Sequence, residues 1–383
     1  MRQGGPADDR GPVGIVLDRA RAARGDRRQS VFRPAPMTGP RITGLEVTRR
    51  SGPLATPFVT ALREVRELEV VELRLHLDDG TTGRAVVAPT PQITGETAES
   101  IEAALLGPLA RVTVGLPLEA SEDTWRAAQR AIVGNTSAKC ALDLAAHDVL
   151  CTRWGVDLPV LLGAASRAVR SDVTVSLGEP EAMAADARSR CAEGFEVLKL
   201  KVGTGPEDDV LRVRAVAAAT EGRAALRLDA NQAWTWRQAQ AALGALERHG
   251  LELDLVEQPV PAADLRGLAR VRAAIPWPVL ADEAVHGPVD VLRVAELEAA
   301  DAVNVKLSKC GGLRSAADVV AVARAAGLGV IVGCMLEPPA AVAAAVAFAA
   351  AVAPDAVHDL DAGRFTGEGG FLRYRPPFVE LPD

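Results

Sequence analysis

The stretch of sequence that decides the fold is a series of short runs: EVLKLKVG (196–203), ALRLDAN (225–231), LDLVEQPV (253–260), PVLADEAV (278–285) and AVNVKLS (302–308). Each run is rich in leucine or β-branched residues, and alanine- and arginine-rich stretches of helical character separate most of them. The rhythm extends outward to DVTVSLG (172–178), GVIVGCML (329–336) and AVHDLD (356–361). Eight such runs predict an α/β fold, a modified (β/α)8 barrel of the (β/α)7β kind.

A doubly wound parallel sheet is the alternative architecture for alternating strands and helices. It fits less well, because no glycine-rich phosphate loop follows an early strand. The lone Lys201-Val202-Gly203-Thr204-Gly205 is a weak match to a dinucleotide motif.

Upstream of the barrel the pattern predicts an α+β capping domain. Residues 41–88 alternate like strands, with a loop through Phe58 and a turn at Asp79-Gly80. Residues 96–154 are helical in character, with a helix that begins near Asn135 and ends at Gly155. We therefore expect three parts, listed here: a flexible extension (1–38), the cap (39–160, joined by 363–383) and the barrel (161–362).

Composition limits the partners. The net charge of −7 argues against a nucleic-acid binder, which needs a basic face. The most apolar stretch, AAVAAAVAFAAAVA from Ala340, is too short to span a membrane and predicts a buried helix. Five scattered cysteines and the lack of an evident leader predict free thiols in a cytoplasmic protein. A homo-oligomer is compatible with this composition.

Charged residues stand where buried strands end, a place that in barrels carries the active site. Asp229, Glu257 and Asp282 are spaced by 28 and 25 residues, about one strand–helix repeat each. Three converging carboxylates without histidine or cysteine favour Mg²⁺. The alternative is that each carboxylate caps the next helix or pairs with a nearby arginine.

Lysines flank this carboxylate set in strand order. Lys199 and Lys201 share one face of their strand, and Lys306 ends a later one. Two lysines on opposite sides of one carbon can remove a proton from one face and return it to the other. Crowded cations and a metal lower a lysine's pKa, so we expect lowered values here. A solvated strand end is the alternative for the Lys199–Lys201 pair alone.

From Arg41 to the C-terminus, the ordered motifs LKLKVG, LRLDANQAW, VEQPV, LADEAV and NVKLSKCGGL resemble the enolase superfamily, muconate-lactonizing subgroup. The resemblance implies that Asp229, Glu257 and Asp282 bind Mg²⁺. It also implies acid/base roles for Lys201 and Lys306, and stabilisation of the substrate carboxylate by Lys199.

Two further segments resemble the dipeptide epimerases of that subgroup. Asp359 and Asp361 resemble the acidic pair that binds a substrate α-ammonium, although a salt bridge with Arg364 is the alternative. Pro57–Arg63 resembles the specificity loop, where Arg63 would grip an acidic side chain; a solvated arginine beside Glu64 and Glu67 is the alternative. Further residues expected at the substrate are Phe58, Thr174 and Met335.

The sequence departs from the family at two places near the expected distal end of the substrate. Gly83–Pro89 lacks an acidic residue that many relatives carry, and Pro338 replaces a small polar residue after Glu337. These departures bear on an Ala-Glu preference and leave the reaction class untouched.

The predicted reaction is 1,1-proton transfer at the C-terminal residue of a dipeptide through an enediolate, with L-Ala-D/L-Glu as the substrate that the resemblance favours. Rival reactions on the same barrel are those of a cycloisomerase, an o-succinylbenzoate synthase or an N-acylamino acid racemase. A non-catalytic small-molecule binding protein is the rival of another class.

Overall fold

The computed structural model describes residues 39–61, 63–118, 121–367 and 369–382. The predicted extension, residues 1–38, lies outside the described residues. In the part of the chain that the structure describes, no helix combines the length and apolar character needed to cross a membrane.

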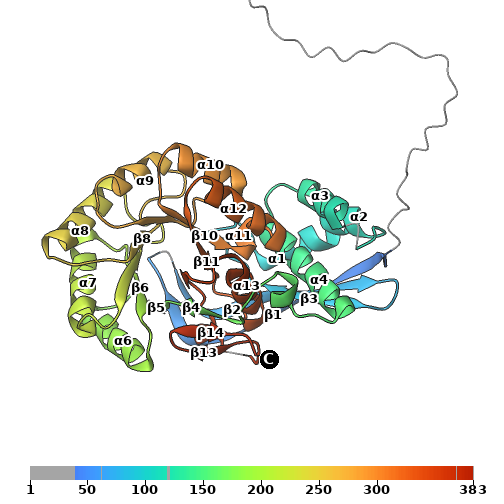
Figure 1. Cartoon of the computed structure of the whole chain (residues 1–383), viewed down its shortest axis with the longest axis horizontal. Coiled ribbons are helices and arrows are strands. Elements are labelled where there is room, and N and C mark those ends of the chain that lie inside the picture. The colour runs from blue at the N-terminus through green and yellow to red at the C-terminus, as the bar shows by residue number, and fades with distance from the viewer. Residues whose placement is uncertain (1–38, 62, 119–120, 368, 383) are drawn as a thin grey trace, which may run out of the picture. The chain divides into compact units, whose positions relative to one another are not determined.

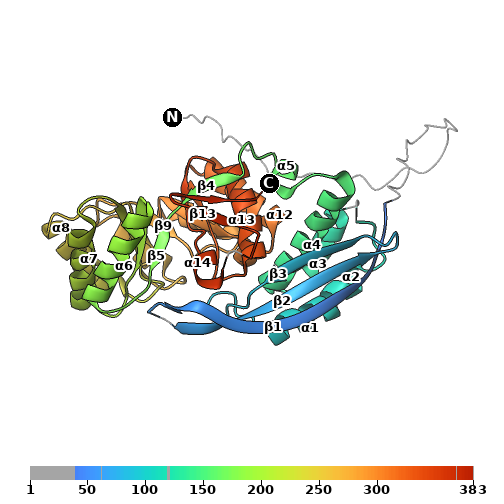
Figure 2. The same ribbon diagram turned by 90° about the horizontal axis from the view of Figure 1, so that it is seen from below.

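The cap is built on an antiparallel meander of β1 (Ile42–Val59), β2 (Glu64–Leu77) and β3 (Thr82–Val87). On β2, Val71, Leu73 and Leu75 are fully buried while their neighbours are partly open, as expected for a sheet with one covered face. The predicted turn at Asp79-Gly80 joins β2 to β3, and Gly80 has φ +85°. Helical segments cover the buried face (Figure 2): α1 (Ala98–Ala104), η1 (Leu105–Leu109), α2 (Ala110–Thr113), α3 (Ser121–Ala131) and α4 (Thr136–Trp154).

The loop expected through Phe58 is instead the end of a long hairpin. Pairing between β1 and β2 runs to Pro53↔Glu67, shifts register, and resumes at Phe58↔Val65. The hairpin then closes at Thr60, whose backbone N–H donates to the Arg63 carbonyl at 2.9 Å. The shift in register falls at residues 54–57, so Pro57, which has no N–H to donate, lies outside the regular ladder.

Helix α4 begins and ends where the sequence predicts, but its N-terminus is capped differently. Asn135 adopts φ +49° and makes no side-chain cap. The Glu96 carboxylate accepts from the backbone N–H groups of Ser137 (2.8 Å) and Ala138 (3.1 Å) instead. A distant carboxylate thus satisfies the free donors of the first turn. Gly155, with φ +61°, ends the helix.

Downstream, the described residues form a curled parallel sheet of seven strands with helices outside it (Figure 1), in the order β11-β10-β9-β8-β7-β6-β5. The strands are β5 (Val173–Val175), β6 (Val197–Lys201), β7 (Ala225–Asp229), β8 (Leu255–Glu257), β9 (Val279–Ala281), β10 (Ala302–Lys306) and β11 (Gly329–Gly333). The helices are α6 (Pro180–Glu193), α7 (Pro206–Thr220), α8 (Trp236–Arg248), α9 (Leu265–Arg272), α10 (Pro288–Glu296), α11 (Leu307–Cys310), α12 (Leu313–Ala325) and α13 (Pro339–Val352).

The eighth strand run, at 356–361, lies between the two ends of this sheet. β12 (Val357–His358) pairs in parallel with β4 (Ala168–Ser171), and Asp359 bridges to Gly333 of β11. The C-terminal hairpin, β13 (Arg373–Arg375) and β14 (Phe378–Glu380), pairs with β4. Two short helices remain: α5 (Leu158–Leu161) precedes β4, and α14 (Gly363–Thr366) lies between β12 and β13. The α/β barrel with an α+β cap is confirmed, while the predicted domain boundaries stay predictions.

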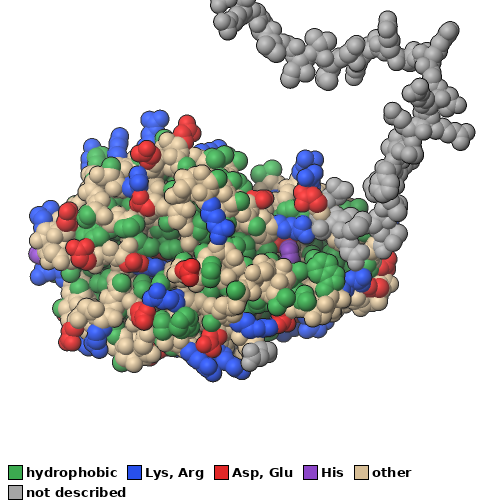
Figure 3. All heavy atoms as spheres, viewed as in Figure 1, with side chains coloured by type: hydrophobic (Ala, Val, Ile, Leu, Met, Phe, Trp, Pro, Cys, Tyr) green, Lys and Arg blue, Asp and Glu red, His purple; other side chains and the backbone are tan. Residues whose placement is uncertain are grey.

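Alternation along the barrel strands separates apolar from charged residues. Leu198 and Leu200 of β6 are fully buried in the main core, whereas Lys199 and Lys201 face inward. By the same alternation, a small separate cluster of Leu255, Leu280 and Ile331 faces the barrel interior. The strand ends therefore deliver charged side chains above an apolar floor. On the face in Figure 3, acidic and basic side chains are interspersed among apolar ones.

Candidate active site

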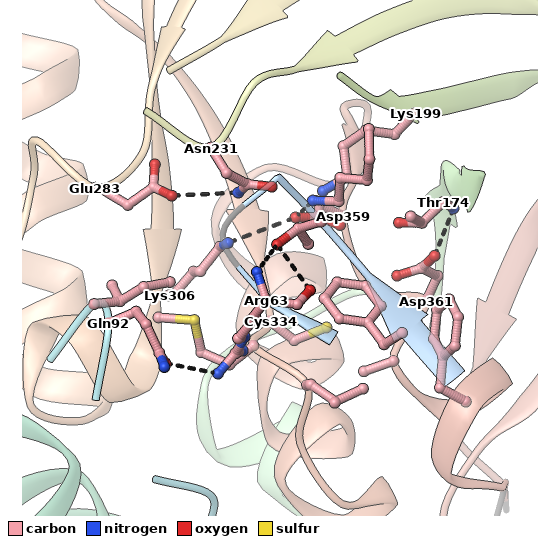
Figure 4. Close-up of a pocket in the computed structure, with 18 residues that line it drawn as sticks. Arg63, Gln92, Thr174, Lys199, Asn231, Glu283, Lys306, Cys334, Asp359 and Asp361 are labelled. Atoms are coloured by element: carbon pink, nitrogen blue, oxygen red, sulfur yellow. Dashed lines mark hydrogen bonds and ion pairs between the residues drawn. The ribbon is translucent and has the colours of Figure 1, made fainter. Parts of the chain in front are cut away.

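A cavity at the strand ends of the barrel is lined on one side by residues of the cap, among them Arg63 and Gln92 (Figure 4). The barrel contributes the three predicted lysines, and the cap contributes residues of the β1–β2 hairpin and of the loop after β3. The predicted site residues that line it are Lys199, Lys201, Lys306, Asp359, Asp361, Arg63, Thr174, Met335 and Phe58. The structure thus brings all nine together, although they span positions 58 to 361.

The three predicted metal ligands lie just behind the cavity wall, at most 1% exposed. Asp229 and Glu257 are directly paired across β7 and β8, and Asp282 follows β9. Their partners are not arginines: Asp229 accepts from Lys201 at 2.6 Å, and Asp282 from Lys306 at 2.7 Å. The alternative of arginine-paired carboxylates is therefore wrong.

Burial and mutual repulsion act on these carboxylates. Burial, together with nearby Asp229 and Asp282, raises the pKa of Glu257 to about 8 against the opposing pull of Lys199. Burial alone would raise the pKa of Asp282, but the ammonium groups of Lys306 and Lys309 outweigh it and hold that pKa below its usual range. The three carboxylates therefore lie close enough together for each charge to affect the others, and buried lysines lie against them.

This donor set fits Mg²⁺ in its chemistry, since it presents only hard oxygen atoms on neighbouring strands. Two buried oxygens beside it, Oδ1 of Asn231 and Oε2 of Glu283, have no hydrogen-bond partner among the described residues. As placed, however, no three His, Cys, Asp or Glu side chains of the described chain are grouped to hold a metal. The carboxylates are turned toward lysine ammonium groups, which supply the balancing charge in this arrangement.

The lysines are buried and ion-paired, which overturns the expectation of a solvated strand end. Lys199 Nζ lies 2.5 Å from Asp359 and 3.6 Å from Glu257, and Lys306 Nζ lies 3.8 Å from Asp359. Burial alone would lower the pKa of Lys199 and of Lys306, but the contacting carboxylates outweigh it and hold both well above their ordinary value. The expectation of a lowered pKa is wrong for Lys199 and Lys306 in this arrangement, because it neglected direct contact between opposite charges.

Room for Lys306 depends on a glycine of the neighbouring strand. A Cβ at Gly333 would lie 2.9 Å from Lys306 Cε and 2.4 Å from Asn304 Oδ1. Any larger residue there would push the lysine from its place.

The acidic pair lies in the cavity wall without the predicted alternative partner. Arg364 pairs with Glu193, so the alternative of a salt bridge between Arg364 and Asp359 or Asp361 is wrong. Lys199 and Lys306 oppose the effect of burial on Asp359 and hold its pKa at about 2. Asp361 accepts from the Thr174 backbone N–H at 2.6 Å, while burial and Asp359 raise its pKa. Thr174 therefore orients one member of the pair.

The cap side of the cavity is less heavily charged. Arg63 donates to Gln92 Oε1 at 3.1 Å, while Glu64 pairs with Arg66, so the alternative of Arg63 beside Glu64 and Glu67 is wrong. Burial lowers the pKa of Arg63. The Phe58 ring lies 5.6 Å from Lys201 Nζ and meets Phe365 edge-on at 5.1 Å.

Neither departure from the family lines the cavity; Arg84, Ala85 and Val86 lie instead with Pro338 along a second hollow. Cys334, Met335 and Leu336, just before Glu337, line the cavity as expected. The position of residues 83–89 and of Pro338 near the distal end of the substrate stays a prediction.

Several buried polar residues at the site were missed by sequence reasoning. Lys309 has no exposed surface and donates to the Asp282 carboxylate and to the Asn304 carbonyl. Asn304 donates to Glu257 at 2.8 Å, and Asn231 links Asp229 to Glu283. Their position next to predicted residues, as in Asp229-Ala230-Asn231 or Lys306–Lys309, was the available signal.

Comparisons with known proteins agree with this geometry. Residues 42–163 match the mandelate racemase / muconate lactonizing enzyme N-terminal domain, and residues 182–380 match the enolase C-terminal domain-like family. The L-Ala-D/L-Glu epimerase of Clostridium acetobutylicum is 40% identical over 310 residues, which cover 81% of this chain and 87% of that protein.

Solved structures give the same answer. A substrate-liganded L-Ala-D/L-Glu epimerase of Bacillus subtilis superposes with a TM-score of 0.85 at 36% identity, covering 89% of this chain and 96% of that one. A dipeptide epimerase of Enterococcus faecalis, complexed with Mg and L-Leu-L-Tyr, gives 0.84 at 31% identity, covering 90% and 98%. The chain is therefore an isomerase of the mandelate racemase / muconate lactonizing enzyme family, within the enolase superfamily.

Proposed function

We propose that the chain is a Mg²⁺-dependent dipeptide epimerase that inverts the α-carbon of the C-terminal residue. One observation carries the proposal: Lys201 of β6 and Lys306 of β10 line the same cavity, and the carboxylate-bearing strands β7–β9 stand between them. A carbon held between these lysines is open to proton transfer from two sides. Relatives named as dipeptide epimerases, one solved with Mg and a dipeptide, support the substrate class.

Each epimer would use both lysines in opposite senses. One lysine takes the α-proton, and the other delivers a proton to the opposite face. Lys199, held at 2.5 Å from Asp359, adds positive charge beside the substrate carboxylate. The Phe58 ring, packed edge-on against Phe365, lies 5.6 Å from Lys201 Nζ and forms an apolar wall beside it.

Asp229, Glu257 and Asp282 would hold Mg²⁺, as their oxygen-only chemistry and mutual crowding support. When bound, the ion supplies Lewis-acid polarisation of the substrate carboxylate, which makes the α-proton more acidic.

Asp359 and Asp361 would bind the free α-ammonium of the N-terminal residue. This requirement disfavours the rival cycloisomerase, o-succinylbenzoate synthase and N-acylamino acid racemase reactions, whose substrates lack an ammonium there. Arg63 supports an acidic side chain on the C-terminal residue, because no carboxylate among the described residues pairs with its guanidinium. A cytoplasmic location belongs to the same proposal.

The test is incubation of the purified protein with L-Ala-L-Glu in deuterated water, with Mg²⁺ or with a chelator. We expect a mass gain of one unit and the appearance of L-Ala-D-Glu only with Mg²⁺. A wider dipeptide library identifies the preferred residues. Failure of every dipeptide to exchange its α-proton in the presence of Mg²⁺ would contradict the proposal.

A further inference from the structure

The cap's contribution to the cavity is uneven in charge. The cap residues that line the cavity are Phe58, Thr60, Arg63, Gln92 and Ile93. Arg63 is the charged member of this set, while the barrel side carries lysines and carboxylates. A substrate group that needs recognition by charge on the cap side must therefore meet Arg63.

Both Arg63 and its partner Gln92 stand on tight turns of the cap backbone. The turn at Thr60–Arg63 is closed by the bond from Thr60 N–H to Arg63 O and by Arg63 N–H to Thr60 Oγ1 at 3.3 Å. The loop that carries Gln92 is closed by Ile93 N–H to Thr90 O at 2.9 Å and by Gly95 N–H to Pro91 O at 3.1 Å. Hydrogen bonds to neighbouring residues thus hold the backbone of both Arg63 and Gln92, which belong to separate elements.

Hydrogen-bond chemistry fixes how the Gln92 amide is turned. A guanidinium only donates, so the amide must present its oxygen to Arg63, as the 3.1 Å bond records. The amide NH₂ then points away from Arg63 with both of its N–H groups available. Among the described residues, no acceptor for that NH₂ is recorded, and the side chain is exposed. Figure 4 shows the two side chains meeting at one side of the cavity.

We infer that Gln92 is a specificity-determining residue, which binds the acidic side chain of the C-terminal substrate residue together with Arg63. One carboxylate oxygen accepts from the Arg63 guanidinium and the other from the Gln92 NH₂. Gln92 also holds the guanidinium in position through its own oxygen. This inference rests on the proposed function and deepens it, because it names a second donor for the acidic substrate class.

The test compares two near-isosteric variants on two matched substrates. Gln92→Leu removes the donor, and Gln92→Glu both removes the donor and places a carboxylate against Arg63. L-Ala-L-Glu carries the carboxylate and L-Ala-L-Gln is its neutral isostere. Gln240→Leu, on α8 and outside the cavity, is the matched control.

We expect Gln92→Leu to raise the KM of L-Ala-L-Glu about tenfold, with kcat nearly unchanged, since a hydrogen bond to a charged group is lost. Gln92→Glu should cost about 100-fold in kcat/KM for L-Ala-L-Glu, because it also neutralises Arg63. L-Ala-L-Gln should change less than about threefold in both variants. Gln240→Leu should match the wild type.

Equal losses on both substrates, or a wild-type level of activity for Gln92→Glu on L-Ala-L-Glu, would overturn the inference. If the wild-type protein exchanges the α-proton of dipeptides but does not prefer L-Ala-L-Glu, the inference about Gln92 is overturned. The proposed dipeptide epimerase function would still stand. Absence of exchange with every dipeptide would overturn the proposed function itself and the inference with it.

Discussion

The two walls of the cavity hold their charges in different ways. On the barrel wall, Lys199, Lys201 and Lys306 are at most 6% exposed, and each contacts a carboxylate of another strand. On the cap wall, Arg63 is joined to exposed Gln92 by one hydrogen bond of 3.1 Å. The barrel charges are held by opposite charges within the protein, whereas the cap arginine has a neutral amide as its recorded side-chain partner. In the function that we propose, the barrel lysines therefore transfer protons, and Arg63 of the cap selects the side chain of the C-terminal residue.

The largest effect is expected from the carboxylates behind the barrel wall. Asp229→Asn, Glu257→Gln or Asp282→Asn should each reduce turnover about 10³-fold or more, because several kcal/mol of charge stabilisation is lost with the metal. Calorimetric Mg²⁺ titration should show weakened binding in the same variants. Glu296→Gln, an exposed change at the end of α10, is the control. Full activity of the wild type in metal-free buffer would contradict the metal assignment.

The next effect concerns stability and contrasts two arginines. Arg227 of β7 is 5% exposed and donates to Asp254 (2.7 Å), Asp172 (2.9 Å) and the Val357 carbonyl (3.0 Å). Arg227→Leu should lower the free energy of unfolding by about 3–5 kcal/mol, because it leaves Asp172 buried without its partner. Arg63→Leu should leave the same quantity nearly unchanged. Urea denaturation measures the free energy of unfolding of both variants. If Arg227→Leu lowers it by less than about 1 kcal/mol, the two arginines do not differ in their contribution to stability.

The smallest effect is confined to particular substrates. Arg63→Ala should raise KM about 10- to 100-fold for dipeptides that end in Glu, and by less than about threefold for those that end in an apolar residue. Arg66→Ala is the matched control, since Arg66 is an exposed arginine of the same hairpin and pairs with Glu64. Steady-state kinetics over the dipeptide library measures the difference. If every dipeptide suffers equally, Arg63 has a structural role.

The barrel and the residues that line its cavity could be predicted from the sequence, because both depend on the spacing of residues along the chain. Strand alternation places Lys199 beside Lys201, and the repeat length places Asp229, Glu257 and Asp282 on successive strands. These features depend on spacing along the chain, which the sequence displays directly.

What sequence reasoning could not reach depends on distances between remote residues. Glu96 caps the N-terminus of α4 at Ser137, which is 41 residues away in the sequence. The β1–β2 hairpin continues beyond Pro57 because pairing between the two strands outweighs the tendency of proline to end a strand. The pKa of Lys306 is raised because Asp282 lies at 2.7 Å, whereas a longer separation would have left burial dominant. Lys309 was missed because its role becomes visible only when Asp282 is placed against it.

In the proposed reaction, Lys201 and Lys306 serve opposite faces of one carbon. The most direct test measures exchange of the α-proton with deuterium in Lys201→Ala and Lys306→Ala, starting separately from L-Ala-L-Glu and L-Ala-D-Glu. Mg²⁺ affinity, measured in the same proteins, shows that the carboxylates remain in place. The account predicts that neither variant epimerises, and that each still exchanges one epimer, the two variants sparing opposite ones. Loss of both exchanges in one variant and retention of both in the other, with Mg²⁺ binding intact, would contradict it.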